Sequence, residues 1–264
     1  MHSKESEFYP VLFYKYYMNI IECTNTANTT IKKNREIKYI VIHYTAGTTS
    51  KPGTAKSTAK YFAKETTKAS ADFIVDDENI VQYNPDIKNR YTWHCGGSKY
   101  KTKGGSLYKI CTSANSIGIE MCSTNHLKKI TAANDENWDF TDAVINNTVE
   151  LVKKLCLEYE VSPYNVIRHY DVNGKPCPGV VGWNEDTNDI SEWEDFKSKL
   201  FPPPIVIEEA EEIVESEPEP VIEEKPVEVK VPQVSEKPEV KQETIKKQGF
   251  FEILLSFFVA LFKK

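Results

Sequence analysis

Two histidines and one cysteine have the types and positions needed to hold a zinc ion. His43 lies near the end of the apolar segment KYIVIHY, and His169 and Cys177 lie eight residues apart in NVIRHYDVNGKPCPG. Zinc prefers imidazole and thiolate ligands, and three protein ligands leave one of its four tetrahedral positions for water, which is typical of a catalytic zinc. Spacing alone leaves open the ordinary alternative, in which each histidine is a structural residue of a strand.

A carboxylate and an ammonium group could complete such a site. Glu120 interrupts SIGIEMC, an otherwise apolar segment in which a buried carboxylate without a partner would be costly. If Glu120 faces the metal, it could take a proton from an attacking water. Lys175, two residues before Cys177, could stabilise a developing oxyanion. The alternatives are a Glu120 that faces solvent or an arginine, and a Lys175 that is an ordinary loop lysine.

Three apolar segments are expected to form the strands that position these side chains. Residues 36–44 are largely apolar on both faces, which is typical of a central strand covered on both sides. Residues 116–122 form a second buried strand, with Glu120 on the face opposite its large apolar side chains. Residues 166–169 form the last strand. An Asn-Gly pair and two prolines predict a loop rather than a helix between His169 and Cys177.

Helical patterns interleave with these strands. Helices are expected over residues 57–68, 141–159 and 190–201, and the segment 71–83 resembles a hairpin around a polar turn. The fold class is therefore α/β, a single domain over residues 18–201 with a central mixed β-sheet flanked by helices.

The two ends of the chain differ in composition from this domain. Residues 1–17 form an extension of unknown role. Residues 202–248 contain 13 Glu, 6 Lys and 8 Pro but no Gly or aromatic residue, so they are expected to be a disordered linker with a net charge of −7. Residues 249–264, GFFEILLSFFVALFKK, are apolar over about 13 residues, which is less than the roughly 20 needed to cross a bilayer. A short helix at a membrane interface is expected there, with back-folding or self-association as the alternative.

Charge and cysteines limit the class of protein. The whole chain carries −6, so the part outside the acidic linker is nearly neutral, and no basic face indicates nucleic acid. No secretory signal is visible, and six irregularly spaced cysteines favour a reducing cytoplasm. We therefore expect the protein to be cytoplasmic until a pore, lysis or another route releases it. No obligate protein partner is evident.

Five motifs in this order resemble one enzyme family. They are IVIHYTAG, ASADFIVDD, WHCGG, NSIGIE and RHYDVNGKPCPG. Together they resemble the zinc-dependent N-acetylmuramoyl-L-alanine amidases of type 2, which include many phage endolysins and are related to peptidoglycan recognition proteins. The resemblance implies Zn²⁺ held by His43, His169 and Cys177, with Glu120 and Lys175 as catalytic residues. It also implies that His94 lies in the substrate groove, with Thr45 and Asn115 as further substrate-binding residues.

One departure from the family pattern affects the assignment of the base. Many relatives carry a Tyr-His or similar pair where this chain has Ala71 and Asp72, so the tyrosine that assists catalysis in part of the family is absent. The base is then expected to be Glu120. Relatives that only bind peptidoglycan commonly lack the cysteine ligand, so Cys177 favours an active enzyme.

The resemblance implies hydrolysis of the amide bond between N-acetylmuramic acid and L-alanine, which degrades the bacterial cell wall. Three alternatives stay open at this point. The chain could bind peptidoglycan without catalysis, it could be a zinc peptidase that cuts within the stem peptide, or it could hold a structural zinc closed by a fourth protein ligand.

Overall fold

The computed structural model describes residues 19–46 and 51–201, and the structural statements below concern these residues. The expected extension (1–17), acidic linker (202–248) and apolar C-terminal segment (249–264) lie outside them. No helix within the described ranges combines the length and the apolar character needed to cross a membrane.

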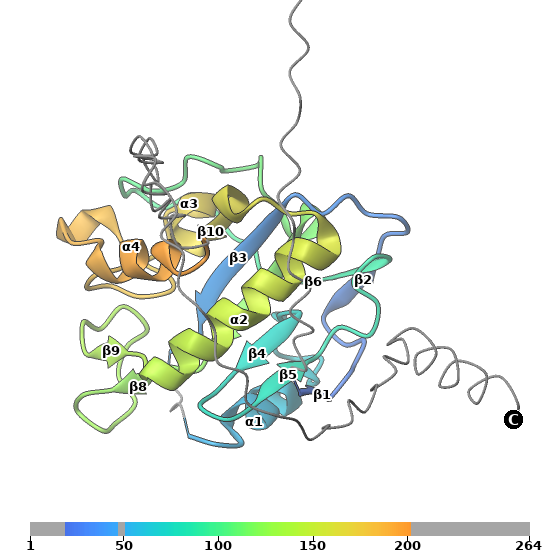
Figure 1. The fold of residues 1–264 in the computed structure, drawn as a ribbon, viewed down its shortest axis with the longest axis horizontal. Coiled ribbons are helices and arrows are strands. Elements are labelled where there is room, and N and C mark those ends of the chain that lie inside the picture. Colours follow the sequence, from blue (N-terminus) through green and yellow to red (C-terminus); the bar gives the residue numbers. More distant parts are fainter. Residues whose placement is uncertain (1–18, 47–50, 202–264) are drawn as a thin grey trace, which may run out of the picture. The chain divides into compact units, whose positions relative to one another are not determined.

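A six-stranded mixed sheet forms the centre of the domain (Figure 1). Its strand order is β1-β5-β4-β7-β3-β10, and of these neighbouring pairs β4 and β5 are antiparallel while the others are parallel. Two small antiparallel sheets, β2-β6 and β8-β9, flank it. The strands are β1 (Ile20–Glu22), β2 (Thr29–Ile31), β3 (Tyr39–Tyr44), β4 (Phe73–Val75), β5 (Ile80–Gln82), β6 (Arg90–Thr92), β7 (Ser116–Met121), β8 (Thr124–Asn125), β9 (Trp138–Asp139) and β10 (Val166–Arg168).

Helices cover both faces of this sheet. The α-helices are α1 (Thr54–Phe62), α2 (Asp142–Tyr159), α3 (His169–Asn173) and α4 (Ser191–Ser198), and the 3-10 helices are η1 (Ser113–Asn115), η2 (Pro163–Asn165) and η3 (Glu185–Thr187). Figure 1 shows α2 running across the sheet. The mixed α/β architecture expected from the sequence is confirmed.

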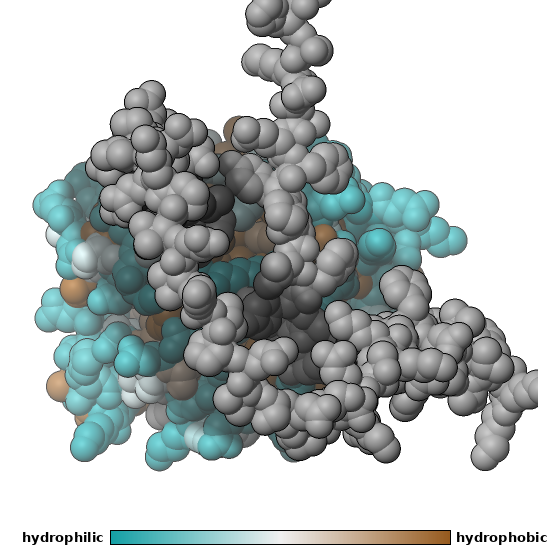
Figure 2. Space-filling view, in the orientation of Figure 1, coloured by the Kyte–Doolittle hydropathy of each residue, from teal (hydrophilic) through white to brown (hydrophobic). Residues whose placement is uncertain are grey.

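Alternation along the central strands determines which residues meet which helix. Ile40 and Ile42 of β3 pack with buried residues of α2 and α4 in the largest core cluster. Ile74 of β4 and Val81 of β5 lie on the opposite face, where they pack against α1. Because side chains alternate along a strand, the remaining positions of β3 and β7 point away from α2. The coloured part of the face drawn in Figure 2 is mostly hydrophilic, with scattered apolar residues.

Several element boundaries differ from the sequence expectation. The strand predicted over 36–44 begins only at Tyr39, and the helix predicted over 57–68 is α1, which begins and ends earlier. Gly53, with a φ of 83°, immediately precedes α1 in a left-handed conformation, which glycine adopts without strain. The helix predicted over 190–201 is one turn shorter at its C-terminal end.

The loop predicted between His169 and Cys177 is wrong in its first part. His169 begins the short helix α3 instead of ending a strand, and Asp171 accepts a hydrogen bond from the backbone N–H of Arg168 at 2.8 Å. Gly174 ends this helix with a φ of 85°. The Asn-Gly pair therefore stops a helix here, because glycine tolerates the left-handed position that commonly follows a helical C-terminus.

Candidate active site and metal centre

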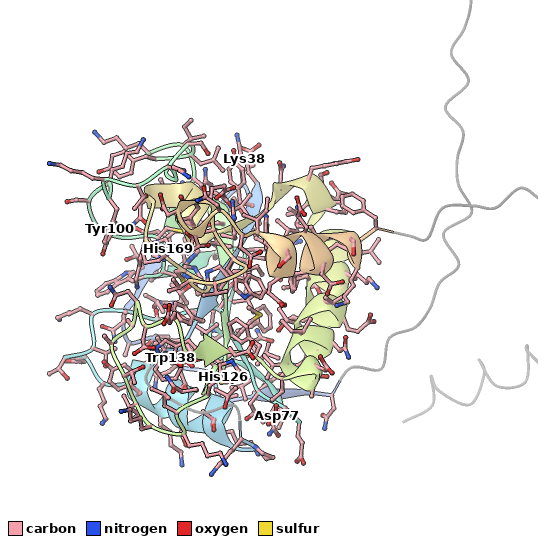
Figure 3. All side chains as sticks on the ribbon, turned by 90° about the vertical axis from the view of Figure 1, so that its left-hand side faces the viewer. Lys38, Asp77, Tyr100, His126, Trp138 and His169 are labelled. Carbon is pink, nitrogen blue, oxygen red and sulfur yellow. The ribbon has the colours of Figure 1, made fainter. Side chains whose placement is uncertain are left out.

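The candidate residues meet at one edge of the central sheet. β3, β7, β4 and β10 are mutually parallel, so their carboxyl ends lie on the same side of the domain. His43 and Glu120 lie near the ends of β3 and β7, and His169 follows β10 directly. Ligands in open α/β sheets commonly bind at this carboxyl edge. In Figure 3, His169 lies between the loop that carries Tyr100 and the β8-β9 sheet marked by His126 and Trp138.

His43, His169 and Cys177 form a compact group of three ligand atoms. Nδ1 of His43 lies 3.1 Å from Nδ1 of His169 and 3.8 Å from Sγ of Cys177, and all three side chains are buried. A tetrahedral zinc with ordinary bond lengths has N···N edges of about 3.3 Å and N···S edges of about 3.6 Å. The two measured edges therefore fit a zinc tetrahedron, and the ligand atoms of all three residues lie within 4.8 Å of one another. Within the described ranges this group has three potential ligands, which leaves a fourth position open.

The protonation of the histidines suits a metal ligand. Burial lowers the pKa of His43 well below its ordinary value, and the neighbouring His169, His94 and Lys175 lower it further. Burial, together with Lys175 and His94, lowers the pKa of His169 to about 3. Both rings are therefore neutral, and neutral imidazoles offer the nitrogen lone pair that a metal needs.

The thiol of Cys177 needs a cation to ionise. Burial raises its pKa to about 12, while the Lys175 ammonium lowers it and Glu120 raises it. A coordinated divalent metal deprotonates a thiol outright. The donor set therefore fits zinc, because metal binding would supply the positive charge that the buried Cys177 thiol needs to ionise.

Backbone contacts hold Cys177 against α3. The backbone N–H of Tyr170 donates to the carbonyl oxygen of Cys177 at 3.0 Å. The side chain of Asn173 donates to the Gly96 carbonyl at 3.0 Å and accepts from the backbone N–H of Lys175 at 3.0 Å. These bonds fix the loop that follows α3, including the backbone of Lys175, and hold Cys177 against the start of that helix.

A cavity of about 790 Å³ opens at Glu120 and Lys175, the charged neighbours of Cys177, while the three ligands themselves lie behind its lining. Glu120, Lys175 and Thr45 line one part of it, α1 lines another, and the β8-β9 connection contributes a third part. The full lining is Tyr44, Thr45, Ala46, Thr54, Ser57, Thr58, Tyr61, Phe62, Ala69, Glu120, Ile130, Ala133 and Lys175. Sequence analysis did not find the α1 residues, because only tertiary packing brings this helix beside the sheet edge.

Glu120 and Lys175 are the two charged groups that line this cavity. Burial raises the pKa of Glu120 to about 8, and the nearby Lys175 opposes this rise. Its Oε2 atom is buried and has no hydrogen-bond partner among the described residues. The pKa of Lys175 is raised mainly by Cys177 and also by Glu120, while burial lowers it. A carboxylate and an ammonium thus share one polar end of the cavity.

Two expected substrate-binding residues lie elsewhere. His94 is buried with 7 % exposure, does not line the cavity and contacts His43 with its ring. Asn115 precedes β7, at the opposite end of the strand from Glu120, where its side chain caps η1 by accepting from the backbone N–H of Thr112 at 2.8 Å. Five strand steps separate the two residues by about 17 Å, so Asn115 lies away from the end of β7 that carries Glu120.

Asp72 is one of the two residues that this chain has where many relatives carry a Tyr-His or similar pair. Its carboxylate is fully buried and accepts hydrogen bonds from Asn84 at 2.6 Å, Thr92 at 2.9 Å and the backbone N–H of Gly118 at 2.8 Å. Arg35 lies 3.9 Å away. Asp72 therefore connects β4, β6 and β7 inside the domain, and it does not line the cavity.

Comparison with known proteins identifies the family. The family model Amidase_2, described as N-acetylmuramoyl-L-alanine amidase, matches residues 33–180, which is more than half of the chain. The protein belongs to this amidase family. The matched range contains all three residues of the candidate metal centre as well as Glu120 and Lys175.

Individual relatives cover a similar part of the chain. N-acetylmuramoyl-L-alanine amidase CwlH of Bacillus subtilis is 34 % identical over 155 residues, which are 58 % of this chain and 52 % of CwlH. XlyA of the same organism is 30 % identical over 162 residues, 61 % of this chain and 43 % of XlyA. The chain thus spans about half the length of these relatives. A solved structure of the catalytic domain of XlyA has a TM-score of 0.49 and 27 % identity, and covers 70 % of this chain and 100 % of that domain.

Proposed function

We propose that this protein hydrolyses the amide bond between N-acetylmuramic acid and L-alanine in peptidoglycan, with zinc as its cofactor. The observation that carries the proposal is the convergence of His43, His169 and Cys177, with Glu120 and Lys175 as neighbours of Cys177 that line one end of a cavity. Family membership supports the choice of bond, since the relatives CwlH and XlyA are named for this amidase activity. The substrate partner would be the muramyl peptide of the bacterial cell wall.

His43, His169 and Cys177 would hold the metal. Zinc bound by three protein ligands supplies Lewis acidity, which polarises a carbonyl group and acidifies water. The distances among the three ligand atoms support this assignment, as does the absence of a fourth ligand in their group within the described residues. An open fourth position favours a catalytic role over a purely structural zinc.

Glu120 would move the proton. Its carboxylate takes a proton from the attacking water and then delivers it to the nitrogen of the leaving L-alanine amine, so that the amine leaves neutral. Deprotonation of Glu120 is required for the first step. The Lys175 ammonium favours the charged carboxylate, and a nearby metal cation would favour it further.

Lys175 would stabilise the negative charge that develops on the carbonyl oxygen. Its ammonium group lines the same cavity as Glu120 and is half-buried, so its field is screened less than that of an exposed lysine. Thr45 and the residues of α1 that line the cavity would contact the rest of the muramyl peptide. Binding there positions the scissile amide between the metal ligands and Glu120.

Digestion of purified bacterial walls tests the proposal. The full chain is incubated with walls with and without a zinc chelator, and the soluble products are identified by mass spectrometry. Stem peptides with a free N-terminal L-alanine, together with intact glycan, are expected, and chelation should abolish them until zinc is added back. New amines within the stem peptide would indicate a peptidase, and wall binding without any product would indicate a silent binding module.

A further inference from the structure

The ring of His94 lies directly behind the metal ligand His43. Nε2 of His43 is 3.1 Å from Nδ1 of His94, and the two rings meet edge to face with centroids 5.2 Å apart. Gly118 of β7 leaves the space for this contact, because a Cβ atom there would lie 2.6 Å from Cγ of His94. Gly118 therefore gives the His94 ring room to pack against β7, the strand that also carries Glu120.

A hydrogen-bond chain from His94 to a backbone carbonyl determines where the protons lie. The hydroxyl of Ser116 donates to the carbonyl oxygen of Thr112 at 2.6 Å, and a carbonyl oxygen can only accept. Oγ of Ser116 is 3.3 Å from Nε2 of His94, and its own proton is already used. Nε2 of His94 must therefore carry a proton and donate to Ser116.

The same reasoning extends to the ligand. Among the described residues no carboxylate hydrogen-bonds to the buried ring of His94, and an uncompensated buried charge is costly, so the ring is neutral. A neutral imidazole protonated at Nε2 has an accepting Nδ1. Two groups face this Nδ1: Nε2 of His43 at 3.1 Å and Sγ of Cys95 at 3.2 Å. A thiol is the weaker donor, so Nε2 of His43 donates to His94 and its lone pair is left on Nδ1, the atom that faces His169 and Cys177.

The two histidine ligands differ in whether their second ring nitrogen has a hydrogen-bond partner. Nε2 of His169 is buried and has no hydrogen-bond partner in the described part of the chain. Nε2 of His43, by contrast, has Nδ1 of His94 as its partner. Hydrogen bonds to the non-ligating nitrogen fix the tautomer and orientation of a histidine ligand. Of the two ligands, His43 is therefore the one whose ring is held in this way.

Building on the zinc site proposed above, we propose that His94 is a positioning residue that accepts the Nε2 proton of His43. This contact holds the His43 ring in place and reserves Nδ1 for the metal. Ser116 and the Thr112 carbonyl in turn hold His94 in the accepting tautomer. The role assigned to His94 is therefore behind the metal centre and outside the substrate cavity.

Two variants of matched shape test the proposal. His94→Asn keeps an oxygen acceptor near the position of Nδ1, and His94→Leu has a similar volume but no acceptor. Zinc is removed from the full-length proteins, and zinc affinity is measured at fixed pH by competition with a chromophoric chelator. His94→Leu should bind zinc about 10–100-fold more weakly than the wild type, the usual cost of losing an outer partner of a metal ligand. His94→Asn should stay close to the wild-type affinity.

Thermal unfolding of the metal-free proteins separates positioning from structure. His94→Leu leaves the Nε2 proton of His43 without an acceptor and His94→Asn does not, so the metal-free melting temperature should fall further in His94→Leu. Zinc affinities are therefore compared below the lower melting temperature, where both variants are folded. Equal zinc affinity in His94→Leu and the wild type would overturn the proposal. So would equal weakening in both variants, because the acceptor would then be irrelevant.

Proton positions in the metal-free wild-type protein give a test that needs no variant. Nitrogen-15 NMR of the histidine rings should show His43 and His94 as neutral tautomers protonated at Nε2. A proton on Nδ1 of His94 would overturn the proposal. So would a second zinc per chain that is lost in His94→Leu and Cys95→Ser, because His43, His94 and Cys95 would then be a metal site of their own. A wild-type protein that binds no zinc would instead refute the proposed function.

Discussion

His43 and Glu120 are paired directly across the two central parallel strands β3 and β7. Paired residues of neighbouring strands project from the same face of a sheet, so the metal ligand and the carboxylate share one side. Their separation is set by strand pairing in the centre of the core, where His43 is only 3 % exposed. A site built on rigid strands holds its geometry better than one built on loops alone.

Glu120→Gln should keep the fold and the zinc but lose activity. The amide has nearly the shape of the carboxylate and cannot accept the proton of the attacking water. A decrease of about 10²–10⁴-fold in the rate of wall hydrolysis is expected, which is the usual contribution of a general base. Glu36→Gln serves as a control, because Glu36 is exposed and outside the cavity. A Glu120→Gln protein that kept more than about a tenth of the wild-type activity would show that another residue is the general base.

Lys175→Met should lower activity less than Glu120→Gln does. Methionine keeps much of the apolar stem of the lysine, and zinc would still stabilise the oxyanion when the ammonium is removed. Turnover of a soluble muropeptide measures the effect, and metal analysis shows whether zinc is retained. Lys101→Met is the matched exposed control. If Lys175→Met matched the wild-type turnover, the lysine would have no part in the reaction.

Cys177→Ser should remove most of the zinc together with the activity. Serine is a poor replacement because its hydroxyl does not ionise as a thiol does when it coordinates zinc. Zinc content per chain, measured after gel filtration, checks this result. Cys156→Ser is a control, since Cys156 is a partly buried cysteine of α2 that packs against the main core. Full zinc content in Cys177→Ser would reject the assigned ligand set.

Asp72→Ala should destabilise the domain without a direct effect on the chemistry. Removal of this carboxylate leaves Arg35 buried and deprives Asn84, Thr92 and the backbone of Gly118 of their acceptor. Breaking a buried ion pair in this way costs about 3–5 kcal/mol, which denaturant unfolding can measure. Glu36→Ala disrupts the exposed pair with Lys38 and should cost at most about 1 kcal/mol. Similar costs for the two variants would refute a structural role for Asp72.

The central strands could be predicted from the sequence because their information is local. Apolar residues on both faces identified β3 and β7, and a period of two placed Ile117 and Ile119 opposite Glu120. The order of strands and the parallel carboxyl edge needed the structure, since pairing joins segments far apart in the chain. β8 and β9 are two residues each, too short for any period to appear.

Loop residues were harder to place. The family resemblance, and not the spacing of the residues, grouped His94 and Asn115 with the substrate. The structure separates them, because Gly118 opens a space behind the sheet for His94 and η1 holds Asn115 at the amino end of β7. Neither contact leaves a periodic signal. Gly118, two residues before Glu120, was the one visible sign that a ring packs against this strand.

The most direct test of the account is to locate the metal by anomalous scattering. Crystals of the full chain, purified with zinc, would be measured on both sides of the zinc absorption edge. We expect a single anomalous peak at about 2.0–2.1 Å from Nδ1 of His43 and of His169 and about 2.3 Å from Sγ of Cys177, with the fourth position facing Glu120. A peak beside His94 and Cys95, a fourth protein ligand on the metal, or no peak at all would contradict the account.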